Sequence, residues 1–239
     1  MIGFLLIVCF PLVLGLGFGS LYMVVYATGR DAAVIDRAGF VLYPLLLLLP
    51  LAFCLVPVWR GDQLAAVGLQ APQLAGLGSA SAVAASLVGG AVVGVLLFYN
   101  ELWVGRLSQR LTQGLTKGRG GLNRLLEGAS ESFAEEGQGV SRAWTLALSV
   151  FVVAAEEFLW RGYLMTYLDQ RFGLAVVWVV VLSSLSFGLN HYYFGLRNVL
   201  LKSFAGAVWA LLFLATGSLL ASFASHYAFE VLVWLRMQR

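Results

Sequence analysis

The sequence carries too few charged residues for a soluble domain of its length. Of its 239 residues, 60% are hydrophobic and only 11% are charged, where a soluble domain has about a quarter. The net charge of +3 is small and its basic residues are divided among several loops, which argues against a nucleic-acid partner. Several apolar runs approach the length of a membrane span, and none alternates with a period of two. We therefore expect an all-α fold, a polytopic transmembrane helical bundle.

Seven segments have the length and apolarity of a membrane span, so we predict about seven spans, within a range of six to eight. No basic region precedes the first apolar run, which is therefore predicted to be a retained span and not a cleaved signal peptide. Cys9 and Cys54 fall inside predicted spans, which argues against a disulfide framework. The predicted spans are residues 2–27, 40–59, 80–104, 143–168, 174–191, 198–215 and 218–234.

The chain divides into three predicted parts: N-terminal transmembrane helices over residues 1–104, a cytoplasmic basic loop over 105–142 and a catalytic helical core over 143–239. Leucines in the loop would supply the apolar edge of a helix lying in the membrane interface. A solvated loop is an equal alternative, because several glycines interrupt any continuous helix there. The basic residues of the loop are Arg106, Arg110, Lys117, Arg119, Arg124 and Arg142.

Basic residues are unequally distributed between the two sets of loops that seven spans would create. The side that includes the C-terminus collects twelve of them, and the other side has two, Arg60 and Arg171. Because cytoplasmic loops are enriched in Lys and Arg, we predict that the N-terminus lies outside and the C-terminus in the cytoplasm, in a bacterial cytoplasmic (inner) membrane. The twelve are Arg30, Arg37, Arg106, Arg110, Lys117, Arg119, Arg124, Arg142, Arg197, Lys202, Arg236 and Arg239.

The fourth predicted span holds two adjacent carboxylates and a guanidinium, those of Glu156, Glu157 and Arg161. Ionisable groups at membrane depth cost at least a few kcal/mol each, and they persist mainly where they pair or form a site. Glu157 and Arg161 are four residues apart, so on a helix they share a face, with the acid on the favourable N-terminal side. Glu156 points about 100° away from Glu157. We therefore predict a structural ion pair beside a carboxylate that is free to act.

Both histidines of the chain, His191 and His226, fall in predicted spans, and Glu230 lies four residues after His226. His226 and Glu230 therefore project from one helix face. A buried glutamate beside a neutral imidazole takes a proton from water, and a second polar pair stabilises charge on a carbonyl oxygen. These residues indicate hydrolysis of an acyl bond. Equally, they are acceptable ligands for a divalent metal with an open position, the four donors being Glu156, His191, His226 and Glu230.

Three ordered motifs, Glu156-Glu157-xxx-Arg161, Phe187-xxx-His191 and His226-xxx-Glu230, resemble those of a known family. The family is that of the type II CAAX-prenyl-protease and bacteriocin-processing (CPBP, or Abi) intramembrane proteases, and the resemblance covers about residues 144–234. It implies a glutamate-dependent peptidase without a metal cofactor, zinc or another divalent metal being the alternative. By motif position, Glu156 with His191 would activate water. Glu157 and Arg161 would support the site, and His226 with the residue at position 230 would form the oxyanion site.

The third motif departs from the family pattern, which usually ends in asparagine where this chain has Glu230. An ionised glutamate repels an oxyanion, whereas an amide donates a hydrogen bond to it. Glu230 is therefore expected to be protonated, to pair with His226 as an imidazolium, or to take another role such as metal ligation.

The expected function is an intramembrane endopeptidase whose partners are the lipid bilayer and a membrane-anchored protein or peptide substrate. A prenylated substrate requires a host that prenylates proteins. Maturation of secreted peptides, removal of sorting tails and self-immunity to bacteriocins suit the resemblance equally. The alternative is a non-catalytic membrane protein, an immunity or scaffold factor that keeps the motifs for packing. The presence of Glu156 and His191 argues against it, because packing alone does not require their chemistry.

Overall fold

The computed structural model describes residues 1–28, 33–60, 67–115 and 142–237, and within these ranges all regular structure is helical. The all-α fold class is therefore confirmed. The elements are α1 Ile2–Val8, α2 Phe10–Ala27, α3 Ala33–Arg60, α4 Ser79–Leu115, α6 Arg142–Glu156, the π-helical η1 Glu157–Leu164, α7 Met165–Phe172, α8 Val176–Leu189, the 3₁₀ turn η2 Tyr192–Phe194, α9 Leu196–Thr216 and α10 Leu219–Met237.

Each predicted segment overlaps one or more helices, and some of the segments differ from the prediction by more than a few residues at an end or contain a break. The first segment is broken into α1 and α2 at Cys9, just before Pro11, whose nitrogen has no hydrogen to donate to the preceding turn. The fourth segment forms one rod of α6, η1 and α7 that contains a π-helical stretch. The third segment continues as α4 to Leu115, so the start of the predicted loop over 105–142 is helical. The prediction for residues 116–141 lies outside the described residues.

Two described helical segments are long and apolar enough to cross a membrane, Ser79–Leu107 and Leu196–Thr216. Two shorter apolar helices cover Leu42–Val56 and Val176–Leu189. The count of seven crossings therefore stays a prediction.

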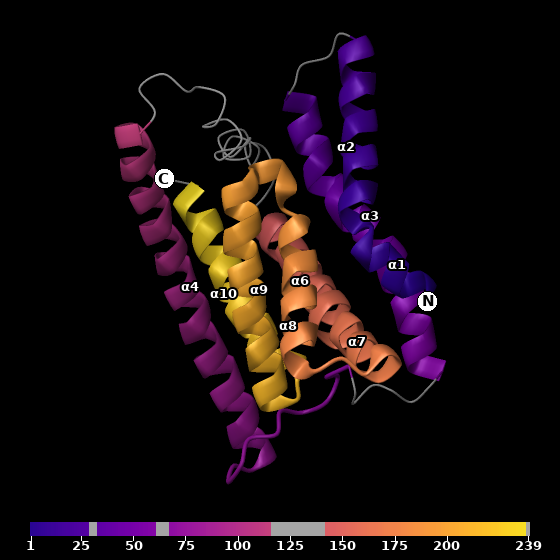
Figure 1. Cartoon of the computed structure of the whole chain (residues 1–239), viewed down its shortest axis with the longest axis vertical. Coiled ribbons are helices and arrows are strands. Elements are labelled where there is room, and N and C mark those ends of the chain that lie inside the picture. Colours follow the sequence, from indigo (N-terminus) through magenta and orange to yellow (C-terminus); the bar gives the residue numbers. More distant parts are fainter. Residues whose placement is uncertain (29–32, 61–66, 116–141, 238–239) are drawn as a thin grey trace.

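The consecutive helices α8, α9 and α10 run antiparallel to one another, whereas α4 runs parallel to its neighbour α10. Figure 1 shows the long helices side by side, with α4 on one outer side and α2 and α3 on the opposite side. Helix α10 packs along both α4 and α9, and α8 packs along α9. The C-terminal ends of α4, α8 and α10 point toward one end of the bundle in Figure 1, and their N-terminal ends lie toward the other.

Helix α4 approaches α10 closely because two glycines, Gly90 and Gly94, face it. A Cβ atom at Gly90 would lie 2.3 Å from the carbonyl oxygen of Ala221, and one at Gly94 would lie 2.1 Å from that of Ser225. Small residues spaced by four allow two helix backbones to come this close. The contact joins a helix of the predicted N-terminal part to the helix that carries His226.

The non-helical segment before α4, residues 67–78, packs against the turn between α9 and α10. The amide of Leu219 donates to the carbonyl of Gly68 at 3.1 Å, and the hydroxyl of Ser218 donates to the carbonyl of Gln70 at 2.7 Å. Gly68 has a φ of 78°, and a Cβ atom there would meet the Phe213 ring at 2.4 Å, so only glycine fits both the conformation and the space. These hydrogen bonds fix the start of α10 and therefore the position of His226 along the axis of the bundle.

We predict that Gly94→Ala lowers the thermal midpoint of the purified protein, because the new methyl group would clash with the backbone of α10. Overpacking of this kind costs about 1–3 kcal/mol. Gly89→Ala is the matched control, since a Cβ atom at Gly89 of the same helix meets nothing within 4 Å. Equal midpoints for the two variants would show that the close contact between α4 and α10 does not exist.

Candidate active site

The two adjacent glutamates lie where the fourth rod changes from α-helix to π-helix. Glu156 is the last residue of α6, and Glu157 is the first of η1, which also contains Arg161. All three side chains are buried, with exposed fractions of 4%, 1% and 0% for Glu156, Glu157 and Arg161. Short π-helical stretches inside α-helices occur frequently at functional sites, and this one is buried along its whole length.

The predicted ion pair between Glu157 and Arg161 is present. The Nη1 atom of Arg161 lies 3.2 Å from Oε1 of Glu157. Nη2 of Arg161 donates to the carbonyl of Gly206 at 3.4 Å, and the guanidinium lies over the rings of Phe187 and Trp209 at 4.3 Å and 5.1 Å from their centroids. Aromatic faces attract a cation, so they partly replace the water that Arg161 has lost.

The same Glu157 oxygen also holds His226. Its Oε1 lies 2.8 Å from Nδ1 of His226, and the imidazole stacks on Trp209 at 3.8 Å between centroids with 17° between the ring planes. Trp209 is itself fixed, because its Nε1 donates to the hydroxyl of Ser225 at 3.0 Å. Since an ionised carboxylate only accepts hydrogen bonds, Nδ1 carries the hydrogen, and the ring presents Nε2 to the rest of the site.

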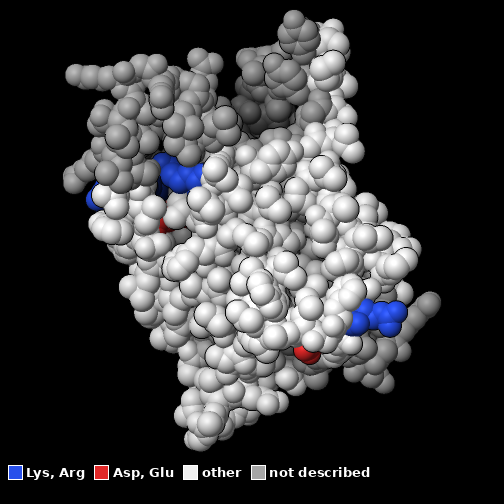
Figure 2. All heavy atoms as spheres, in the orientation of Figure 1, with Lys and Arg blue, Asp and Glu red and all other residues white. Residues whose placement is uncertain are grey.

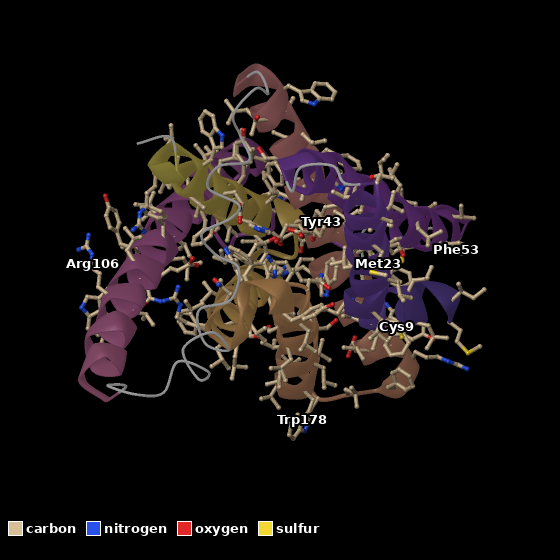
Figure 3. All side chains as sticks on the ribbon, turned by 90° about the horizontal axis from the view of Figure 1, so that it is seen from above. Cys9, Met23, Tyr43, Phe53, Arg106 and Trp178 are labelled. Carbon is tan, nitrogen blue, oxygen red and sulfur yellow. The ribbon has the colours of Figure 1, made fainter. Side chains whose placement is uncertain are left out.

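Glu156 faces His226 and is held from the other side by Tyr43. Its Oε2 lies 3.6 Å from Nε2 of His226, and its Oε1 accepts a hydrogen bond from the Tyr43 hydroxyl. Figure 3 shows Tyr43 in the middle of the bundle, whereas Phe53 of the same helix lies at the periphery. The sequence analysis did not include Tyr43. Its only signal was a hydroxyl in an otherwise apolar segment.

His191 lies in the turn after α8, so the prediction that it belongs to the helical span 174–191 is wrong by two residues. Its Nδ1 lies 3.3 Å from the carbonyl of Phe187, and the Phe187 ring packs against both His191 and His226, with centroids 5.1 Å and 5.7 Å away. Within the described residues, no hydrogen bond or ion pair joins His191 to Glu156. The imidazole in direct reach of Glu156 is that of His226.

Glu230 has a counter-ion that the sequence analysis did not assign to it. Its Oε1 lies 3.8 Å from Nε2 of His226 and 3.7 Å from Nζ of Lys202. The ammonium of Lys202 also lies 3.7 Å from Oε2 of Glu101 on α4. Lys202 is buried within α9, so counting it among the loop charges was wrong.

Of the four donors named for a metal site, Glu156 and Glu230 each approach Nε2 of His226, at 3.6 Å and 3.8 Å. Within the described residues no hydrogen bond or ion pair joins His191 to any of them. In the same ranges, no three His, Cys, Asp or Glu side chains are grouped so that they could hold a metal ion. The residues therefore do not form the predicted four-ligand site.

Comparison with known proteins identifies the part of the chain that carries these residues. No curated protein and no solved structure matches the sequence. Residues 139–232 match the family described as type II CAAX prenyl endopeptidase Rce1-like. The matched segment includes the glutamate pair, both histidines and Glu230, whereas Tyr43 and Glu101 lie before it. This match confirms the resemblance of the three motifs, which all lie within residues 139–232, to that family.

Proposed function

We propose that this protein is an intramembrane endopeptidase that hydrolyses a peptide bond of a membrane-associated protein or peptide. The family match supports protease chemistry. The observation that carries the proposal is the convergence of the buried carboxylate of Glu156 and the fixed imidazole of His226, whose facing atoms are 3.6 Å apart.

A membrane location is supported by the apolar side chains on the outer faces of the helices. Large hydrophobic residues are exposed on many of the described helices, and soluble proteins rarely expose apolar patches of this extent. In the face shown in Figure 2, the charged side chains of the described residues appear toward two opposite sides, and the broad white area between them carries none. Examples of the exposed residues are Leu16, Leu48, Val92, Trp103, Trp178, Leu200 and Leu211.

We propose a multi-pass topology of about seven spans in a bacterial cytoplasmic membrane, with the C-terminus in the cytoplasm. The antiparallel arrangement supports it, because the C-terminal ends of α4, α8 and α10 lie toward the same end of the bundle. The loops that carry most of the basic residues follow these ends, as cytoplasmic loops are expected to do.

Water activation follows from the geometry of Glu156 and His226. Two groups 3.6 Å apart can both hydrogen bond to one water molecule at the usual distance of about 2.8 Å. The water oxygen attacks the carbonyl carbon of the substrate while the Glu156 carboxylate takes a proton from the water. The π electrons of the carbonyl group move to the carbonyl oxygen. When the tetrahedral intermediate collapses, the C–N bond breaks and Glu156 gives the proton to the leaving amine. Glu156 is then ionised again, and the products are a carboxylic acid and an amine.

The other residues hold these two groups in place or face the substrate. Glu157 and Arg161 orient His226, and Tyr43 orients Glu156. We propose that His191 contacts the water or the substrate from the end of α8, and that His226 and Glu230 lie on the side of the carbonyl oxygen. We propose that the mechanism is metal-free and that Glu156 and His226 together position the water.

We predict that Glu156→Gln lowers the rate of peptide cleavage at least about 100-fold, because a general base contributes about 10²–10⁴ to the rate. The assay uses the full chain in lipid vesicles with a panel of membrane peptides, including one CAAX peptide with and without a farnesyl group. Asp169→Asn is the control, since Asp169 is an exposed acid of the same helical rod. A chelator is expected to leave the rate unchanged.

Each contradictory outcome points to a different alternative. Undiminished cleavage by Glu156→Gln would exclude this residue as the base. Loss of activity with chelator and recovery with zinc would replace the mechanism by a metal-dependent one. The membrane peptides of host cells that express the wild type can be compared with those of cells that lack the protein. If the two sets are the same, the protein is better explained as a non-catalytic immunity or scaffold protein.

We predict that Tyr43→Phe lowers kcat about tenfold without unfolding the protein, because it removes the hydroxyl that orients Glu156 but keeps the ring. Hydrogen bonds to charged groups contribute about 1.5–3 kcal/mol. Tyr99→Phe, an exposed tyrosine of α4, is the control. A kcat equal to that of the control would show that Tyr43 does not position the base.

A further inference from the structure

We propose that Lys202 of α9 is a further catalytic group, whose ammonium hydrogen bonds to the carbonyl oxygen of the substrate as negative charge develops on it. This inference rests on the proposed function. It addresses the departure at Glu230, where the family pattern has an amide that would donate a hydrogen bond and this chain has a carboxylate that would repel an oxyanion.

The burial of Lys202 is the first observation that requires a reason. The residue is 9% exposed, and lysine is almost never buried unless it is paired. Its Nζ atom lies 3.7 Å from Oε1 of Glu230, 3.7 Å from Oε2 of Glu101 and 4.0 Å from the centroid of the Phe229 ring. Three helices, α4, α9 and α10, therefore hold one cation at this place.

The hydrogen-bonding capacity of this cation is not used by its neighbours. An ammonium group has three donors, and N–H···O hydrogen bonds are about 2.7–3.2 Å long. Both carboxylates lie beyond that distance, so within the described residues Lys202 makes ion pairs and a cation–π contact but no hydrogen bond. Its donors remain available to a group that enters the site.

A row of short contacts connects Lys202 to the proposed base. Glu230 Oε1 is 3.7 Å from Lys202 Nζ and 3.8 Å from His226 Nε2, and His226 Nε2 is 3.6 Å from Glu156 Oε2. We place the carbonyl carbon of the substrate peptide bond next to the water held by Glu156. Its carbonyl oxygen would then lie toward Glu230, within reach of the flexible Lys202 side chain.

The exposure of these side chains is consistent with entry of the substrate from the Lys202 side. The side chains of Glu230 and Glu101 are 34% and 27% exposed, whereas that of Glu156 is 5% exposed. The site is therefore more exposed at the two carboxylates that hold Lys202 than at Glu156, the proposed base.

The charge of Lys202 resolves the conflict at Glu230. An ionised Glu230 beside the carbonyl oxygen would oppose the reaction, but the Lys202 ammonium next to it offsets its negative charge and offers hydrogen-bond donors. Glu230 and Glu101 hold the ammonium between them. Lys202 and Glu230 together then replace the amide of the family pattern.

The test compares kcat and KM of full-length variants in lipid vesicles, with a peptide that the wild type cleaves. We expect Lys202→Met to lower kcat and kcat/KM equally, by about 100-fold or more, as does the loss of an oxyanion donor. Lys202→Arg, which keeps a cationic donor, is expected to recover part of the rate. Arg106→Met removes an exposed cation of α4 at the periphery of the bundle and serves as the control.

A double variant separates this role from a structural one. If Lys202 only neutralised Glu230, Lys202→Met combined with Glu230→Leu, which removes the carboxylate without adding a donor, would restore both the thermal midpoint and kcat. We expect the midpoint to recover and kcat to stay low. A kcat of Lys202→Met within threefold of wild type, or full recovery of kcat in the double variant, would overturn the inference alone. A wild type without hydrolytic activity would overturn the inference together with the proposed function.

Discussion

The carboxylate of Glu157 is the group on which the rest of the site depends, because one of its oxygens contacts both Arg161 and His226. Removing one partner of a buried ion pair costs about 3–5 kcal/mol, since it leaves a charge unpaired in a low-dielectric interior. The carboxylate therefore fixes the position of Arg161 under two aromatic rings and the orientation of the His226 ring. With Nδ1 occupied by Glu157, Nε2 is directed to Glu156. The Glu157 carboxylate thus determines which atom of His226 faces Glu156, the proposed base.

Helices outside the family-matched segment complete the site. Tyr43 of α3 donates to Glu156, and Glu101 of α4 contacts Lys202. Helix α4 reaches this position because Gly90 and Gly94 let its backbone approach α10. Helices before the matched segment, which add only hydrophobicity to the family resemblance, therefore position groups next to the proposed reacting centre.

Local spacing predicted part of this arrangement, and long-range packing determined the remainder. The helical segments and the Glu157–Arg161 pair followed from apolar run length and from a separation of four residues, which are properties of one helix. Tyr43 and Glu156 are 113 positions apart, and no local pattern relates them. The pairing of Glu156 with His226, in place of the expected direct partner His191, also depends on how separate helices pack. His191 was assigned to a helix that ends at Leu189, and the π-helical turn at Glu157 had no sequence signal that we used.

The most direct test of the central role of Glu157 is the exchange and chemical shift of the His226 ring protons in ¹⁵N-histidine-labelled protein. The chain has only two histidines, so His191→Gln assigns the spectrum without ambiguity. We predict a His226 Nδ1–H signal that is shifted downfield by its carboxylate acceptor and exchanges slowly with water. A His226 ring whose Nδ1 carries no proton, or whose Nδ1–H exchanges as fast as a solvent-exposed imidazole, would contradict the proposed arrangement.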